Sequence, residues 1–243
     1  MGVNAQPVVR IGTGNWVPYV DQQRVDGGAL ARLTREIFHA AGYQVEFVYY
    51  PWDRNLLMLE QGHLDAVMPY VCTPARQRIS TCSDVVATGD IVLFQRVGQQ
   101  LTWSRIEDLK HFRIATTLGY SYGQAFDTAL QTGQLNVLQS GKEETGLRLL
   151  SLGRADFYPQ DRAVGYAMLY RLFSAQERAA ITHNPRVLDR AELHLLFRKN
   201  DAQADRLREV FNAGLQRLAG RGELKRLQQA LNSGTADQWL VRP

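Results

Sequence analysis

Strand and helix signals alternate along this chain, and no other feature limits its fold as strongly. Residues 8–12 predict a strand, apolar side chains recur at helical spacing over residues 30–41, and residues 45–49 alternate as a second strand. A short helix over 53–61 and a buried strand over 64–68 follow. Alternation of this kind is typical of a mainly parallel sheet with helices on its faces. The first part of the chain is therefore predicted to be a β-α-β-α-β unit.

The same alternation begins again after an apolar segment at residues 91–94. The predicted elements of this second part are a strand over 112–116, a helix over 125–130, a strand over 135–138, a helix over 147–152 and a strand over 155–158. The chain therefore contains a second α/β unit.

Two segments, 91–96 and 192–198, are candidates for the connection between the units. The second of them precedes two amphipathic helices, which need a core to cover and are expected to return to the first unit. Lobe 1 would then comprise residues 1–95 and 196–243, and lobe 2 residues 96–195. This predicts an α/β fold of two lobes joined by a two-strand hinge, with a ligand cleft between them.

The two predicted units share a local pattern. In each, a helix is stopped by a glycine, and an aspartate three residues later precedes a buried strand: Gly62 and Asp65 in the first unit, Gly153 and Asp156 in the second. Such junctions are common, so chance similarity is the alternative explanation. If the pattern is structural, the ends of both strands are candidate walls of one cleft.

Composition excludes several classes of protein. The chain has 243 residues, 45% of them hydrophobic, and its net charge of +4 comes from basic residues interspersed with acidic ones, which gives no support to nucleic-acid binding. No apolar stretch is long enough to span a membrane, and the start of the chain has no basic-then-apolar signal pattern. We expect a monomeric protein and, if it is exported, a signal peptide that has been removed.

The two cysteines, Cys72 and Cys82, lie ten positions apart. No His or Cys set nearby could complete a zinc site, so we expect neither a metal nor a cofactor. In an oxidising compartment the pair could form a disulfide, whereas in the cytosol both would remain thiols. The spacing does not decide between these alternatives.

Arg76 lies between these cysteines, just after the predicted strand over 64–68. Open α/β sheets bind ligands at the carboxyl ends of their strands, and a guanidinium group has the geometry to hold a carboxylate. A solvated surface arginine is the alternative. The surrounding sequence favours the binding role.

An ordered set of motifs resembles a known family. These motifs are Trp16-Val17-Pro18-Tyr19, Pro51-Trp52, Gly62-His63-Leu64-Asp65-Ala66, Thr73-Pro74-Ala75-Arg76, Cys82-Ser83-Asp84, Ile106-Glu107-Asp108-Leu109, Gly119-Tyr120-Ser121 and Gly153-Arg154-Ala155-Asp156. In this order they resemble the bacterial extracellular solute-binding proteins of family 3, the polar amino acid binding components of ABC importers. The resemblance implies a type II periplasmic-binding-protein fold.

The resemblance also implies roles for charged residues and for one turn. Arg76 would clamp the α-carboxylate of the ligand, and Asp161 would take its α-ammonium group. The turn Gly119-Tyr120-Ser121 would complete the carboxylate site from the second lobe through backbone N–H groups. Many relatives carry Ser or Thr where this chain has Val71, so only the Val71 backbone could serve.

Aromatic residues complete the expected site. Trp16 and Trp52 fall on positions that sandwich the ligand side chain, and Tyr70 belongs to the same wall of the first lobe. Binders of cationic or amidated side chains often have aspartate where this chain has Thr13. Lysine, arginine and histidine are therefore less expected as ligands, and the ligand could be other than a standard amino acid.

Two enzyme readings compete with binding. Residues 119–123 match the G-x-S-x-G pattern around a nucleophilic serine, and Ser121 is followed by the acids Asp156 and Asp161 and then by His183 and His194, as in serine hydrolases. Cyclohexadienyl dehydratase shares the fold of the family and its carboxylate-binding arginine, but needs a general acid, for which only Asp161 stands out.

We therefore expect a periplasmic or lipid-tethered receptor without catalytic activity. Its lobes would close over a small amino acid or related carboxylate, and a membrane partner would recognise the closed form. That partner could be an ABC permease, a chemoreceptor or a sensor kinase.

Overall fold

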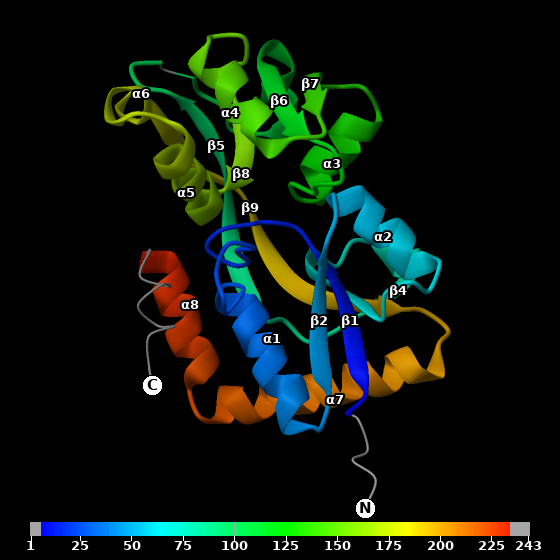
Figure 1. The fold of residues 1–243 in the computed structure, drawn as a ribbon. Coiled ribbons are helices and arrows are strands. Elements are labelled where there is room, and N and C mark those ends of the chain that lie inside the picture. The colour runs from blue at the N-terminus through cyan, green and yellow to red at the C-terminus, as the bar shows by residue number, and fades with distance from the viewer. Residues whose placement is uncertain (1–5, 100, 234–243) are drawn as a thin grey trace, which may run out of the picture. The chain divides into compact units, whose positions relative to one another are not determined.

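A computed structural model describes residues 6–99 and 101–233, and the start of the chain at residues 1–5 lies outside the described part. The chain divides into two compact units (Figure 1). The described residues up to Thr88 and from Glu192 onward form unit 1, and Gly89–Ala191 form unit 2. Both contain strands and helices, which confirms the predicted α/β class.

The sheet of unit 1 has strand β1 (Val8–Thr13) between two parallel neighbours. Strands β2 (Gln44–Tyr49) and β3 (Ala66–Val71) pair with β1 on either side, and both are parallel to it. Strand β9 (Ile181–Arg198) pairs antiparallel with β3 and with the short strand β4 (Ser80–Cys82). The carboxyl ends of the three parallel strands therefore lie at one edge of this sheet.

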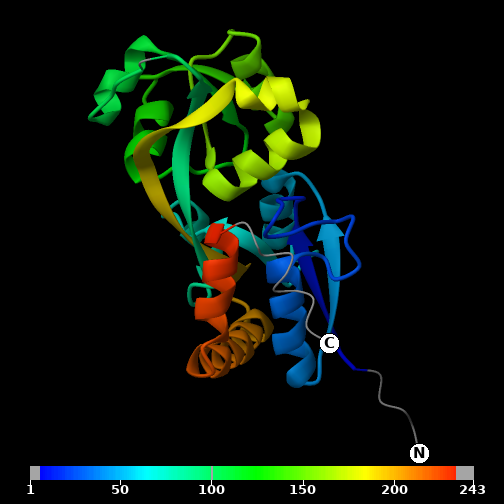
Figure 2. The ribbon, with the colours of Figure 1, turned by 90° about the vertical axis from the view of Figure 1, so that its left-hand side faces the viewer.

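Helices cover this sheet because each has one apolar face. They are α1 (Ala29–Ala40), α2 (Trp52–Glu60), α7 (Ala202–Gly220) and α8 (Glu223–Ser233). Helix α7 packs on α1, with the ring centroids of Phe38 and Phe211 5.7 Å apart. Gly214 lies where a Cβ atom would overlap Ile37, so a small residue is needed at this crossing. Helix α8 turns away sharply from α7 (Figure 2).

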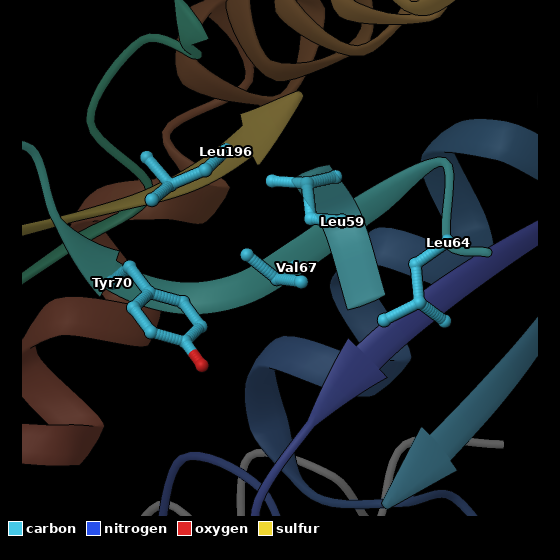
Figure 3. Packing of buried hydrophobic residues seen from close by; sticks show 5 residues of the cluster. All are labelled: Leu59, Leu64, Val67, Tyr70 and Leu196. Atoms are coloured by element: carbon cyan, nitrogen blue, oxygen red, sulfur yellow. The ribbon is translucent and has the colours of Figure 1, made fainter. Parts of the chain in front are cut away.

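Part of the core of unit 1 lies between α2, β3 and β9. Its buried members are Leu59, Leu64, Val67, Tyr70 and Leu196 (Figure 3). Complete burial of a side chain as large as leucine stabilises a fold by about 1.5–3 kcal/mol. This cluster therefore fixes the strand that leads to Arg76, and its member Tyr70 extends from the core to the candidate site.

Unit 2 contains two pairs of strands. Strand β6 (Arg113–Thr117) is parallel to β7 (Asn136–Ser140), and β8 (Tyr158–Asp161) is antiparallel to β5 (Ala87–Arg96). The helices are the 3-10 segment η2 (Ile106–His111), α3 (Gln124–Gln131), α4 (Glu143–Ser151), α5 (Arg162–Leu172) and α6 (Ala175–Ala179).

One predicted strand is displaced in the structure. The strand expected over 155–158 is β8 at Tyr158–Asp161, and Phe157 forms only an isolated bridge to Ile114. Strands β8 and β3 both continue through a proline. Strand β8 lies at the edge of its sheet, where Pro159 is tolerated, and β3 pairs irregularly with β9 around Pro69.

The glycine-aspartate pattern forms the same structure in both units. Asp65 accepts the backbone N–H of Arg10 at 2.7 Å, and Asp156 accepts that of Arg113 at 2.8 Å. In return, the backbone N–H of each aspartate donates to the carbonyl of the same arginine. Each aspartate thus joins a helix-strand junction to a neighbouring strand, β1 in unit 1 and Arg113–Thr117 in unit 2.

The chain passes from one unit to the other at two points, between residues 88 and 89 and between residues 191 and 192. Strand β5 spans the first point and strand β9 the second. In unit 2, Asp90 of β5 pairs with Arg162 at 3.1 Å and with Arg190 of β9 at 3.2 Å. One carboxylate therefore links these two strands to the start of α5. Among the helices that the structure describes, none is long and apolar enough to cross a membrane.

Candidate functional site

Arg76 begins the 3-10 segment η1 (Arg76–Arg78), which follows β3. Its Nη1 atom donates to the Val71 carbonyl at 2.7 Å, and its guanidinium carbon lies 4.9 Å from the centre of the Tyr70 ring. The hydrogen bond and the ring fix the side chain at the carboxyl end of β3. The backbone of Val71 was expected to contact the ligand. In this structure its carbonyl accepts a hydrogen bond from Arg76.

The loop that carries Arg76 is closed by a disulfide between Cys72 and Cys82, whose Cα atoms lie 6.1 Å apart. Within the loop, the Ser80 hydroxyl donates to the Arg76 carbonyl at 2.8 Å, and the Thr73 hydroxyl accepts the Arg76 N–H at 3.3 Å. The covalent bridge and these two bonds restrict the backbone on both sides of the arginine.

Aromatic rings form a continuous wall in unit 1. Trp16 stacks on Tyr19 at 4.5 Å between ring centroids and meets Trp52 edge to face at 6.2 Å. Trp52 in turn meets Tyr70 edge to face at 5.4 Å. Trp16 and Trp52, which were expected to lie on either side of a ligand side chain, therefore contact each other in this structure.

Backbone contacts hold this wall in place. The Tyr70 hydroxyl donates to the Trp52 carbonyl at 2.8 Å, which ties the start of α2 to β3. Burial raises the pKa of Tyr70 above its usual value, so this phenol is a hydrogen-bond donor at neutral pH. The Trp52 ring lies over Gly14, where a Cβ atom would approach the ring to 2.7 Å.

Asp161 ends strand β8 in unit 2 and is 1% exposed. Its Oδ1 atom accepts the backbone N–H groups of Ala163 and Val164 at 2.9 and 3.1 Å, so it is also the N-cap of α5. These bonds and the positive end of the helix stabilise the carboxylate as an anion. A buried carboxylate held in this way attracts a positively charged group.

The turn at 119–123 leads into α3 and contains Gly119 and Gly123, both with positive φ. Asp127 of α3 accepts the Tyr122 N–H at 2.9 Å with Oδ1 and the Ser121 hydroxyl with Oδ2. This carboxylate therefore takes two hydrogen bonds from the turn that was expected to bind the ligand carboxylate.

Buried tyrosine side chains contact Thr117, the last residue of the strand that leads into this turn. Tyr122 is 1% exposed and its hydroxyl oxygen accepts the Thr117 N–H at 2.7 Å, while Tyr158 is fully buried and its hydroxyl lies 3.3 Å from the Thr117 hydroxyl. Burial raises the pKa of all three tyrosines of this region, Tyr120, Tyr122 and Tyr158. These three phenols are thus protonated and uncharged at neutral pH.

The contacts of Ser121 do not form a hydrolase triad. Its hydroxyl donates to Asp127, whereas His183 bonds the Tyr166 hydroxyl and His194 bonds the Ser83 carbonyl. A nucleophilic serine needs a base that accepts its proton and is positioned for the reaction. Within residues 6–99 and 101–233, no group of three or more His, Cys, Asp or Glu residues could hold a metal ion.

Three residues that contact the candidate residues of their own unit escaped the sequence reasoning: Gly14 and Tyr19 in unit 1 and Asp127 in unit 2. Tyr19 was visible as part of the Trp16 motif, but its stacking on the indole was not. Asp127 sits in the first turn of a predicted helix, where an acid usually interacts with the backbone N–H groups. That position could have indicated its bonds to the preceding turn.

The sequence of residues 9–232 matches the family model for bacterial extracellular solute-binding proteins, family 3. This match spans nearly the whole chain. The chain belongs to this family. A comparison of this family 3 protein with curated proteins finds no match.

Solved structures share the fold of this family 3 protein, the type II periplasmic-binding-protein fold. A histidine kinase sensor domain with similarity to periplasmic binding proteins has a TM-score of 0.78 at 20% identity, with 97% of each chain covered. The substrate binding protein of an amino acid ABC transporter has a TM-score of 0.74 at 18% identity, covering 97% of this chain and 100% of that one.

A third structure is the ancestral amino acid-binding protein AncCDT-1, a precursor of cyclohexadienyl dehydratase. Its TM-score is 0.73 at 22% identity, covering 92% of this chain and 95% of that chain. At such identities the likeness establishes the fold alone.

Proposed function

We propose that this family 3 protein is a periplasmic receptor that captures a small amino acid or amino-acid-like carboxylate between its two lobes. The observation that carries the proposal is the fixed guanidinium of Arg76 at the end of β3. Family membership supports the same function. We propose the same lobe boundaries and the same site residues as the sequence indicates.

Arg76 would bind the ligand α-carboxylate. A guanidinium group carries five N–H donors in one plane, and the bond to Val71 orients that plane. A bidentate contact with a carboxylate requires such orientation. The disulfide and the Tyr70 ring limit the rotation of the side chain, which reduces the entropy lost on binding.

Asp161 would bind the α-ammonium group from unit 2. The two backbone N–H groups that it accepts at the start of α5 orient this carboxylate and favour its negative charge. A cation and an anion on separate units suit the two ends of an amino acid. Contact with both units would stabilise the closed arrangement and produce the signal for a partner.

The partner would be a membrane protein, either an ABC permease or a sensor kinase. Structures of both kinds of system share this fold. The disulfide between Cys72 and Cys82 favours an oxidising compartment such as the periplasm.

Catalysis of the dehydratase type has less support. It needs a protonated general acid, whereas the hydrogen bonds to Asp161 favour its ionised form. Assays with prephenate and arogenate test this alternative directly, because turnover of either would establish an enzyme.

A ligand screen tests the proposed receptor function. A bound ligand raises the unfolding midpoint by mass action, so a thermal-shift screen of amino acids and related carboxylates identifies candidates for calorimetry. We expect Arg76→Ala to weaken binding more than about 100-fold, because a buried carboxylate loses its charged partner. Arg78→Ala removes an exposed arginine from the same segment and serves as the control. Unchanged affinity in Arg76→Ala would contradict the proposal.

A further inference from the structure

The end of α7 and the start of α8 carry an excess of positive charge. Residues 211–233 contain four basic residues and a single acid, Glu223, which leaves a net charge of +3 in this stretch, against +4 for the whole chain. The four basic residues, which we call the basic corner, are all exposed: Arg217, Arg221, Lys225 and Arg226. The net positive charge of the chain is therefore concentrated at one place in unit 1.

The basic corner projects from unit 1. Gly222 has a φ of 72°, which lets the chain turn sharply from α7 into α8 (Figure 2). A Cβ atom placed on Gly220 or Gly222 would meet no other described part of the chain within 4 Å. Arg226 spans the turn, because its Nη2 atom donates to the Arg221 carbonyl at 2.9 Å. The corner is thus an open, convex surface that a flat partner can approach.

Helix stability accounts for only part of this charge. A cation near the carboxyl end of a helix interacts favourably with the helix dipole, and Arg217 has this position in α7. Lys225 and Arg226 lie in the first turn of α8, where the dipole disfavours a cation. Within residues 6–99 and 101–233, neither Arg217, Arg221 nor Lys225 forms an ion pair with an acid. These three cations are therefore available to an external anion.

The start of α7 shows a different distribution of charge. Asp205, Arg206, Arg208 and Glu209 alternate in sign, and Arg208 pairs with Asp205 at 3.7 Å. Opposite charges interspersed in this way compensate one another and are typical of a solvated helix face. The excess of positive charge is therefore confined to the other end of the helix.

The basic corner lacks the apolar centre of a protein interface. Such interfaces bury aromatic or aliphatic side chains at their core and are depleted in lysine. Among the described residues, the large apolar side chains that are exposed, such as Tyr166 and Tyr170 of α5, all lie outside residues 211–232. A bilayer with anionic phospholipids instead presents a dense layer of phosphate groups, and each Lys or Arg held near it contributes about fivefold to the affinity.

We propose that the basic corner binds the surface of a membrane that contains anionic phospholipids. The contact is electrostatic: the guanidinium groups of Arg217 and Arg221 and the ammonium group of Lys225 bind lipid phosphates at the surface. It requires neither a bound amino acid nor Arg76, so it is independent of the proposed receptor function. In a receptor, such contact concentrates the protein near its membrane partner.

Co-sedimentation of the whole protein with vesicles, in the absence of any amino acid, tests the proposal. One set of vesicles contains equal parts of phosphatidylglycerol and phosphatidylcholine, and the other contains phosphatidylcholine alone. We expect binding to the first set only. Binding should decline as the salt concentration rises, because salt screens the attraction between exposed charges.

The triple variant Arg217→Gln/Arg221→Gln/Lys225→Gln removes the three available cations. It keeps Arg226, which bonds the end of α7. At about fivefold for each residue, we expect its affinity for phosphatidylglycerol vesicles to fall by about 100-fold. The single variant Lys225→Gln, which changes one exposed side chain, should lose about fivefold.

A second triple variant, Lys110→Gln/Lys142→Gln/Arg154→Gln, is the matched control. It removes the same amount of charge from three exposed positions of unit 2. It should bind the vesicles about as well as the wild type. Circular dichroism and denaturant unfolding establish that each variant is folded.

Three results would overturn the proposal. The first is no binding of the wild type to phosphatidylglycerol vesicles at low salt, and the second is equal weakening in both triple variants, which would show that net charge alone acts. The third is competition by soluble polyglutamate as effective as that of vesicles at equal charge, which would show that an acidic protein segment fits the corner as well. The receptor function is judged separately, because the basic-corner variant should bind the amino acid from the screen with wild-type affinity.

Discussion

Arg76 is bonded to the carbonyl of Val71, five residues before it, through its Nη1 atom at 2.7 Å. The strand end that presents the arginine therefore also orients it. Relatives with a hydroxyl residue at position 71 would gain a side-chain contact, whereas in this chain the valine contributes its backbone alone. The precision of the proposed carboxylate site thus depends on the shape of the loop from 71 to 76.

Arg76→Lys should weaken ligand binding by about tenfold or more although it keeps the charge. A lysine ammonium is a compact group on a flexible stem and cannot hold the fixed, planar geometry of a guanidinium. Isothermal titration calorimetry with the ligand from the screen measures the loss, with Arg78→Lys as the matched control. Equal affinities of the wild type and Arg76→Lys would show that charge alone is sufficient.

Loss of the disulfide between Cys72 and Cys82 should destabilise the fold by roughly 2–3 kcal/mol, the value expected for a short covalent loop. Because the loop also carries Arg76, ligand affinity should fall as well. Denaturant unfolding with and without reductant measures the first effect and calorimetry the second. The double variant Cys72→Ser/Cys82→Ser should match the reduced protein and be insensitive to reductant; full affinity after reduction would argue against a role for the bridge in binding.

Stability should decline at acidic pH partly through Asp156. The hydrogen bond from Arg113 holds the pKa of this carboxyl below its usual value of 3.8. A lowered pKa in the folded state stabilises the protein above pH 4 or so, and this stabilisation is lost as the pH falls through the folded-state value. Asp156→Asn should therefore be less stable at pH 7, by about 1–3 kcal/mol, and lose less on acidification.

Denaturant unfolding from pH 7 to pH 2.5 or so tests the role of Asp156. Glu60→Gln is the control, because it removes an exposed acid at the end of α2. Parallel acid profiles for the wild type and Asp156→Asn would exclude a contribution from this carboxylate.

Stability should also decline at alkaline pH, through Tyr122 and Tyr158. Burial raises the pKa of both phenols above the usual value of 10.0, so they stay protonated in the folded protein after they have ionised in the unfolded chain. The unfolded state then binds fewer protons, and the free energy of unfolding falls as the pH rises above about 10. Absorbance of tyrosinate and denaturant unfolding, measured together, should show these phenols titrating only as the protein unfolds. Ionisation of every tyrosine near pH 10 without loss of structure would contradict their burial.

Sequence reasoning was most successful where one strong physical signal acted alone. The helical spacing of Leu30, Leu33, Ile37 and Phe38 predicts α1, and the same four residues are buried in the structure. Helices α7 and α8 also occur where apolar residues recur. The position of Arg76 just after β3 was predicted from one buried strand alone.

Other elements gave weaker or conflicting signals. Helix α5 was missed because residues 162–172 have no clear apolar stripe, and its cap, Asp161, was considered only as a ligand residue. The short helix predicted over 53–61 begins at Trp52, directly after Pro51, and has no side-chain cap to mark its start. Contacts between distant segments, such as those of Trp16 with Trp52 or of Asp189 with Gly123, have no signature in local sequence.

Gly14 controls the position of one ring in the aromatic wall of Trp16, Tyr19, Trp52 and Tyr70. The indole of Trp52 rests directly on the backbone at position 14, so the position of the ring depends on the absence of a side chain there. Any larger residue at position 14 would move the Trp52 ring away from the backbone, although Trp52 itself is not mutated. If the aromatic wall lines the proposed ligand site, position 14 sets the space left for the ligand, through a residue that offers no functional group of its own.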